Sequence, residues 1–198
     1  MYKVRLKAAL LAVAIAAPGL ADVTGAAPGL DDYYPLREGR SWVFRSAGGR
    51  AEARATKAGL ELPQYFDGMR RTERLTFEKG RLILNGIDSP EPNEITPGIH
   101  LLVHPLRSGA AWSSKGKWAN AYDLVLTGKV AGFESVRVPA GLFRCAKVEL
   151  KYSFVAGGGM TYDYTRTLWL APGVGIVRHV FRHVGGSTGT LELESYRR

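Results

Sequence analysis

The sequence lacks most of the motifs that identify large protein classes. Its single cysteine, Cys145, excludes an internal disulfide framework and a cysteine-based zinc finger. The spacing G-x-S-x-G occurs over residues 185–189, but this glycine-rich segment is expected to be a turn between two strands and not the strand-to-helix elbow of a nucleophilic serine. No H-E-x-x-H or EF-hand pattern occurs, and Trp118 follows Gly116-Lys117 where a phosphate-binding loop needs Ser or Thr. These absences exclude several large enzyme classes. We assign no catalytic residue, no metal ligand and no cofactor from the sequence, and we favour a non-enzymatic role.

The first 21 residues have the pattern of a secretory signal peptide. Three basic residues precede an uncharged apolar run over residues 8–17, and small residues at Gly19 and Ala21 offer a cleavage site. A helix of that length spans about 15 Å, half of the bilayer core of about 30 Å. Cleavage after Ala16 or Ala26 is an alternative. We therefore expect a mature chain over residues 22–198 that is periplasmic or secreted and has no transmembrane span.

The charge balance is basic without a basic cluster. The chain has 27 Lys and Arg against 18 Asp and Glu, a formal net charge of +9. The basic residues are scattered, with no run of five or six of the kind that marks a nucleic-acid-binding tail. The sequence therefore predicts no nucleic-acid partner. A positive net charge favours anionic partners such as lipid head groups, but it identifies no particular one.

Short alternating segments separated by glycine pairs dominate the chain after residue 30. Residues 71–78 alternate polar and apolar side chains, and Asn85-Gly86 predicts a hairpin turn. Residues 51–58 are compatible with a short helix or a strand, and the proline-rich residues 88–98 are expected to form an irregular loop. About ten strands at this spacing predict a mainly β protein, an antiparallel twisted sheet curled into an open barrel or half-barrel.

One motif occurs twice, as P-L-R-x-G-x-x-W over residues 35–42 and again over residues 105–112. One interpretation is a single β domain over residues 22–198 that consists of two related halves. The other is that the same entry from a loop into a strand is used twice. Every matched residue suits a turn or a core position, which favours the second interpretation.

The histidines and the cysteine are interpreted as structural. The pairs His100/His104 and His179/His183 are four residues apart, which in a strand separates them by about 13 Å, too far for one metal ion. We expect these histidines at the surface or half-buried. Cys145 is expected to be a buried apolar residue, with a reactive thiol near basic neighbours as the alternative.

Aromatic residues are numerous enough to line a concave sheet as well as a core. Tyr152 and Phe154 lie on one arm of a glycine-rich hairpin around residues 157–159, and Tyr162 and Tyr164 lie on the other. The two aromatic pairs are expected to face each other across it. The candidate ligand contacts are Trp42, Trp112, Trp169, Tyr152 and Tyr162.

Three segments together resemble a group of exported bacterial proteins of unknown function, many of them lipoproteins. They are D-Y-Y-P-L-x-x-G-x-x-W from Asp32, V-P-A-G-x-F from Val138 and W-x-A-P-G-V-G-x-V from Trp169. The resemblance implies a β-rich domain in the cell envelope and brings no catalytic residue. The chain departs from the lipoprotein members because it has no cysteine at the signal cleavage site.

These observations predict an exported cell-envelope protein that binds an apolar or amphiphilic ligand such as a lipid. One alternative is a structural or interaction module whose partner is another envelope protein. The other is a hydrolase that acts on an anionic envelope polymer and uses Glu91, Glu94 or Asp163 as its acid.

The signal-peptide prediction is tested by expressing the full chain in a Gram-negative bacterium. We expect the intact mass of the periplasmic or secreted product to begin at residue 22, because the apolar run is long enough for export and too short for an anchor. A matched variant, Leu11→Arg, interrupts the apolar run and should leave the precursor in the cytoplasm. An uncut precursor in the membrane fraction would contradict the prediction.

Overall fold

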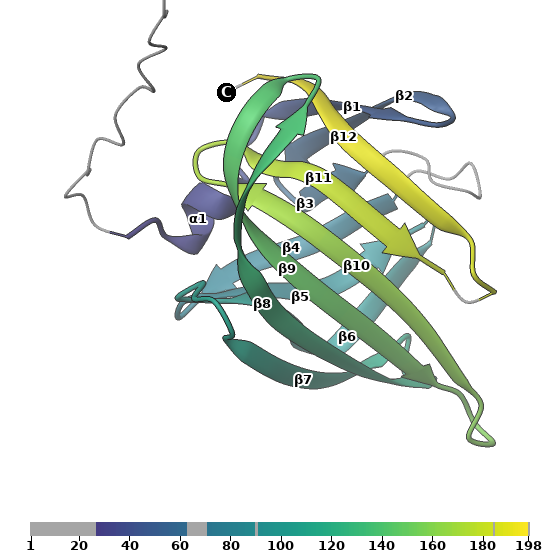
Figure 1. Cartoon of the computed structure of the whole chain (residues 1–198). Coiled ribbons are helices and arrows are strands. Elements are labelled where there is room, and N and C mark those ends of the chain that lie inside the picture. Colours follow the sequence, from purple (N-terminus) through teal and green to yellow (C-terminus); the bar gives the residue numbers. More distant parts are fainter. Residues whose placement is uncertain (1–26, 63–70, 90, 184, 198) are drawn as a thin grey trace, which may run out of the picture.

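Twelve strands and one short helix make up the described part of the chain in this computed structural model (Figure 1). The structure describes residues 27–62, 71–89, 91–183 and 185–197. The predicted signal peptide, residues 1–21, lies outside the described residues. The elements are α1 (Leu30–Tyr33), β1 (Ser41–Ser46), β2 (Gly49–Thr56), β3 (Gly59–Leu62), β4 (Arg71–Glu78), β5 (Arg81–Asp88), β6 (Pro92–Val103), β7 (Ala111–Trp118), β8 (Tyr122–Val138), β9 (Gly141–Val155), β10 (Thr161–Ala171), β11 (Gly175–Arg182) and β12 (Thr188–Arg197).

The strands form a closed antiparallel barrel. Each strand pairs with its neighbour along the chain, and β1 completes the ring by pairing with β12. Closure satisfies the backbone groups that would otherwise lie at the two edges of the sheet. The prediction of a mainly β, antiparallel and curled sheet is confirmed. The barrel is closed rather than open, and it has twelve strands where about ten were expected.

The additional strands come from segments with an ambiguous pattern. Residues 51–58, compatible with either a helix or a strand, contribute most of β2. The proline-rich segment over residues 88–98, expected as an irregular loop, contains the first half of β6. The prediction of a loop was wrong because both prolines of β6 occupy places where a missing N–H group is tolerated. Pro92 is the first residue of the strand, and Pro97 lies where the register between β5 and β6 shifts.

The prediction of a hairpin turn at Asn85-Gly86 was also wrong. The chain reverses at Lys79-Gly80, where both φ angles are positive, at 47° and 74°, and β5 continues through Asn85. Gly86 lies beside the Arg74 guanidinium, which would collide with a Cβ atom at this position. Glycine here permits a close approach between a backbone and a side chain rather than a turn.

The repeated motif adopts the same turn at both places. Gly39 and Gly109 have φ angles of 87° and 82°. In each turn the amide after this glycine donates to the carbonyl of the arginine in the motif, at 3.1 and 2.9 Å. Each turn leads into a strand, β1 or β7, so local geometry accounts for the repeat. A division of the chain into two related halves stays a prediction.

One end of the barrel is packed with side chains under α1. The helix is joined to the β10–β11 connection by a hydrogen bond from the Gly173 amide to the Asp32 carbonyl, at 2.9 Å. Trp42, on β1, donates its indole N–H to the Val174 carbonyl at 2.6 Å. Tyr33 and Tyr34 are buried beside them. The helix lies at this end of the barrel (Figure 1). The buried aromatic side chains fill the space beneath it.

We expect Gly59→Ala to lower the free energy of unfolding by about 1–3 kcal/mol more than Gly49→Ala. Both glycines have positive φ angles, but a Cβ on Gly59 would collide with the Glu73 carbonyl, whereas one on Gly49 would meet nothing within 4 Å. The difference therefore isolates the close approach of β3 to β4. Urea unfolding measures it, and equal losses would contradict the packing shown here.

Candidate functional site: a cavity inside the barrel

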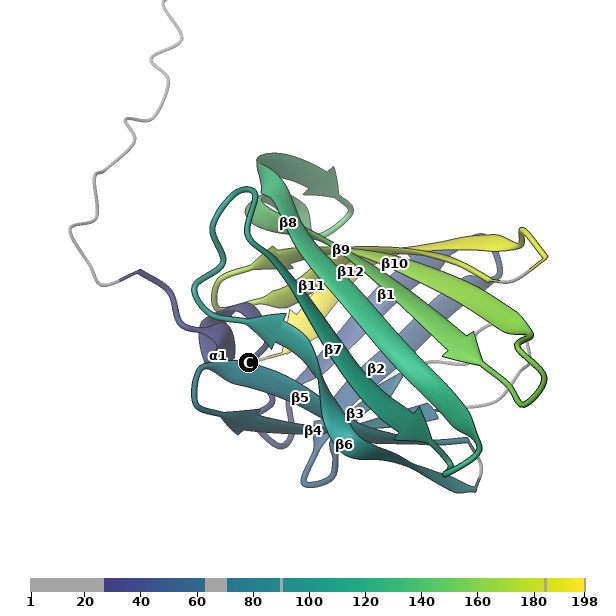
Figure 2. The same cartoon turned by 90° about the horizontal axis from the view of Figure 1, so that it is seen from below.

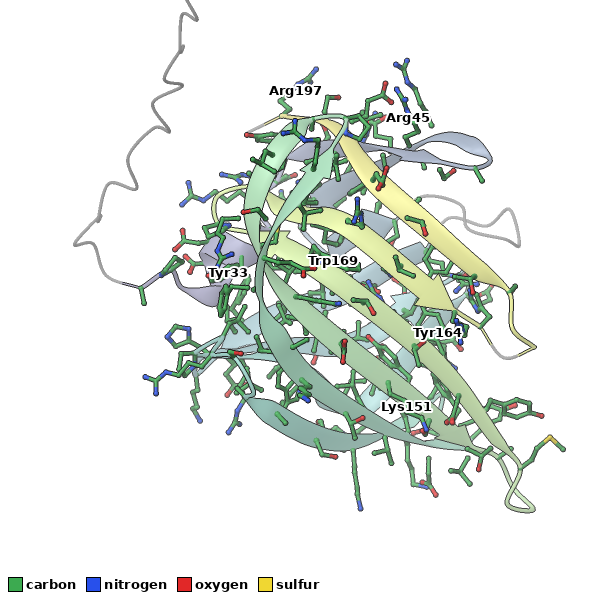
Figure 3. The ribbon with its side chains drawn as sticks, viewed as in Figure 1. Tyr33, Arg45, Lys151, Tyr164, Trp169 and Arg197 are labelled. Carbon is green, nitrogen blue, oxygen red and sulfur yellow. The ribbon has the colours of Figure 1, made fainter. Side chains whose placement is uncertain are left out.

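A cavity of about 400 Å³ opens inside the barrel. Leu62 at the end of β3, Arg71 at the start of β4 and Trp118 at the end of β7 all line it. These strand ends lie at the end of the barrel opposite α1. Figure 3 accordingly places Tyr164, another lining residue, far from Tyr33. The barrel is thus packed at one end and hollow at the other.

Five consecutive strands form an apolar wall of the cavity. β5 to β9 contribute Leu84, Ile95, Trp118, Leu124 and Phe154 in that order. The rings of Trp118 and Phe154 meet edge to face, with centroids 5.7 Å apart. Such a surface favours the burial of hydrocarbon, at about 25 cal/mol per Å² of apolar area removed from water.

A buried ion pair crosses the interior and also lines the cavity. Glu73 is on β4 and Arg166 is on β10, six strands apart around the ring in either direction. Figure 2 shows these two strands on opposite sides of the barrel. The Arg166 Nη1 atom donates to Glu73 Oε1 at 2.5 Å, and each side chain is 3% exposed. The pair therefore joins opposite walls across the lumen.

Two neutral side chains orient the guanidinium of this pair. Arg166 Nε donates to His179 Nε2 at 3.2 Å, and Nη1 also reaches the Tyr152 hydroxyl at 3.5 Å. Burial, together with the nearby guanidinium, lowers the pKa of His179 well below its usual value, so the imidazole is neutral and accepts the bond. Burial raises the pKa of Tyr152, which keeps its hydroxyl protonated.

The ion pair retains hydrogen-bonding capacity. Among the described residues, Glu73 Oε2 and Arg166 Nη2 are buried without a hydrogen-bond partner. One is an acceptor and the other is a donor. A buried polar atom without a partner costs free energy, so a ligand that satisfied either atom would gain affinity.

Of the five residues predicted to contact a ligand, Tyr152 lines this cavity. Tyr162, ten residues along the same hairpin, pairs with Phe154 rather than with Tyr152. It is 38% exposed near the hairpin tip, and its hydroxyl contacts the Met160 sulfur. The two aromatic pairs therefore face each other across the hairpin as expected, with Phe154 opposite Tyr162 and Tyr152 opposite Tyr164.

The three predicted tryptophans do not line this cavity. Trp42 is in the core under α1, as described above. Trp112 donates its N–H to the His100 carbonyl at 2.9 Å and packs over Gly128. Trp169 donates to Glu134 at 2.5 Å. Lys147 and Arg178 lie over its ring, at 5.4 and 5.6 Å from the centroid.

The carboxylates considered for hydrolysis do not line the cavity. Glu94 is paired with Arg74 at 2.6 Å. Asp163 is held at 2.8 Å from Lys151 and accepts a bond from Ser153, contacts that lower the pKa of this exposed carboxyl. Glu91 is exposed. The carboxylate inside the barrel is Glu73, which sequence reasoning did not select.

A signal for the buried pair was present in the alternation of β4. Glu73 occupies the same face as Leu75, which is the apolar phase of the strand. Arg166 likewise shares a face with Leu168 on β10. A charge in the apolar phase of a strand requires a buried partner. The pattern can identify each residue, but not the pairing between them.

The histidines and the cysteine are placed as follows. His179 is fully buried, so the expectation of a surface or half-buried position was wrong for this residue, because its neutral ring serves Arg166. The described residues contain no cluster of three or more His, Cys, Asp or Glu that suits a metal ion. Cys145 is buried, as expected, and burial raises its pKa to about 11.

No helix among the described residues has the length and apolarity to cross a membrane.

The described residues therefore define a closed antiparallel barrel with an apolar interior cavity and a buried ion pair. The DUF3108-like family model matches residues 107–180, from the turn before β7 into β11. No curated protein matches the chain.

Three solved structures are similar to the chain. A candidate lipoprotein from Parabacteroides distasonis is 17% identical, with 83% of this chain and 98% of that chain covered and a TM-score of 0.49. A candidate exported protein with a YmcC-like fold from Bacteroides fragilis is 14% identical, with 84% and 99% covered and a TM-score of 0.47. The hypothetical lipoprotein YmcC from Escherichia coli is 14% identical, with 80% and 85% covered and a TM-score of 0.44. At these scores the similarity supports no argument about function.

We expect Arg166→Met to lower the free energy of unfolding by about 3–5 kcal/mol, because it leaves the Glu73 carboxylate buried without its counter-ion. The double variant Glu73→Leu/Arg166→Met removes both charges and should lose less than the sum of the two single changes, with a coupling of about 2–3 kcal/mol. Urea unfolding of the four proteins measures this coupling.

The control is the exposed Lys117–Asp123 pair, whose charged atoms are 2.8 Å apart. The cycle Lys117→Met/Asp123→Leu should show coupling below about 1 kcal/mol because solvent screens this pair. Equal coupling in the two cycles would contradict a special role for the buried pair.

Proposed function

We propose that this protein is an exported binding protein that holds an apolar or amphiphilic ligand inside the barrel, without catalysing a reaction on it. The observation that carries the proposal is the cavity between the apolar wall of β5–β9 and the Glu73–Arg166 pair. Its volume of about 400 Å³ lies within the range of ligand pockets, about 300–1,000 Å³.

The proposed cellular setting is the periplasm or the extracellular space. Support for it comes from the signal-peptide pattern of residues 1–21 and from the sequence resemblance to exported proteins. Of the predicted contacts, the proposal retains Tyr152 in the cavity. Trp42, Trp112, Trp169 and Tyr162 are not needed for it.

Native mass spectrometry of the mature protein, purified without detergent, tests the proposal. We expect a reproducible additional mass of lipid size that organic extraction removes. The variant Ile87→Trp places a larger side chain at the cavity wall and should abolish the additional mass. Its control is Leu142→Trp, at a position that is 59% exposed and outside the cavity lining, which should retain it.

Both variants must first show the far-UV circular dichroism and cooperative unfolding of the parent protein. A clean protein mass, combined with no uptake of added apolar compounds, would overturn the proposal. It would favour the alternative of an interaction module that binds another envelope protein.

A further inference from the structure

We infer that the ligand carries an electrically neutral polar group, a hydroxyl or an amide, that hydrogen-bonds to both Glu73 and Arg166, while its hydrocarbon part lies along β5–β9. The inference rests on the proposed function and adds the chemical class of the ligand. It depends on the charge balance, the hydrogen-bonding capacity and the depth of the buried pair.

The charges of the pair cancel where the polar group would bind. Glu73 and Arg166 are opposite charges in direct contact, and each side chain is 3% exposed. The two groups that contact Arg166 beside them, His179 and Tyr152, are neutral. The Arg166 guanidinium is therefore already compensated. Arg71 and His183 also line the cavity, at the start of β4 and directly after the end of β11.

A second anion at this place would be repelled. A ligand carboxylate or phosphate that reached Arg166 would also lie close to the Glu73 carboxylate, away from water. Like charges interact strongly at low dielectric, and burial of an uncompensated anion costs several kcal/mol. A neutral group avoids both costs.

The hydrogen-bonding capacity of the pair matches such a group. Glu73 Oε2 can accept hydrogen bonds and Arg166 Nη2, with two N–H groups, can donate them, and neither atom has a partner among the described residues. A hydroxyl or a primary amide both donates and accepts, so one group can satisfy both atoms. A hydrocarbon without a polar group can satisfy neither.

The register places this group deep in the barrel. Glu73 lies two residues inside β4 from its first residue, Arg71, and Arg166 lies beyond Tyr164 on β10. The apolar wall runs from Leu84, which pairs with Leu75 two residues beyond Glu73, to the barrel end, where Trp118 and Phe154 meet. The ligand would therefore enter with its polar group first.

Dissociation constants for four probes with the same chain, dodecanol, dodecanamide, dodecane and dodecanoate, test the inference on the mature protein at pH 7. We expect dodecanol and dodecanamide to bind about tenfold or more tightly than dodecane and dodecanoate, since hydrogen bonds to charged groups are among the stronger ones. Dodecanoate should bind more tightly as the pH falls toward about 5, by about tenfold per pH unit, because only its neutral acid fits. The affinity for dodecanol should not follow this trend.

The variant Glu73→Gln leaves the Arg166 charge uncompensated and should shift the preference toward dodecanoate by at least about tenfold. Glu94→Gln, which alters a carboxylate outside the cavity, is the control and should leave the preference unchanged. If Glu73→Gln does not fold, the pH series on the unmodified protein still tests whether the site prefers a neutral group to an anion.

The outcomes separate the inference from the proposed function. Tight binding of dodecanoate at pH 7 that is lost in Arg71→Gln would overturn the inference, since the polar group would then bind an anion site at the start of β4. Equal binding of dodecane and dodecanol would also overturn it, while the proposed function stands. If none of the four probes binds, both fail.

Discussion

The ion pair between Glu73 and Arg166 is the interaction on which the rest of the interior depends. It joins β4 to β10 across the full width of the ring, where no backbone hydrogen bond can form. Two charges buried this deeply require each other, because either one alone costs several kcal/mol. The requirement fixes which residues face inward on both strands. It also divides the lumen into a packed half and a hollow half.

The two halves differ in the way they are filled. Toward α1, the aromatic side chains of Tyr33, Tyr34 and Trp42 fill the barrel, and the Val174 carbonyl accepts the indole N–H of Trp42. Toward the other end, the apolar side chains of β5–β9 line a cavity and do not meet in its centre. A small barrel with twelve strands has room for both because its circumference exceeds what side chains alone fill. The ion pair lines the cavity and gives it polar groups beside the apolar wall.

Alternation in the sequence identified the β class but misjudged several local features. Asn85-Gly86 has the composition of a hairpin turn, yet Gly86 is needed where the Arg74 side chain crosses β5. The prolines of residues 88–98 indicated a loop, yet Pro92 begins a strand. In both cases the residue type occurs in turns as well as at particular places in a strand. Contacts with the neighbouring strand decide which of the two forms, and the local sequence does not reveal those contacts.

The sequence by itself determined the antiparallel β architecture, the phase of most strands, the turns at Gly39 and Gly109 and the export pattern of residues 1–21. These depend on alternation, backbone freedom and local composition, all of which act over a few residues. Only the tertiary structure decided that the barrel closes, that Tyr152 lies in a cavity while the predicted tryptophans do not, and that Glu73 pairs with Arg166. The physical reason is distance along the chain. The two charges are 93 residues apart, and closure of the ring brings them together.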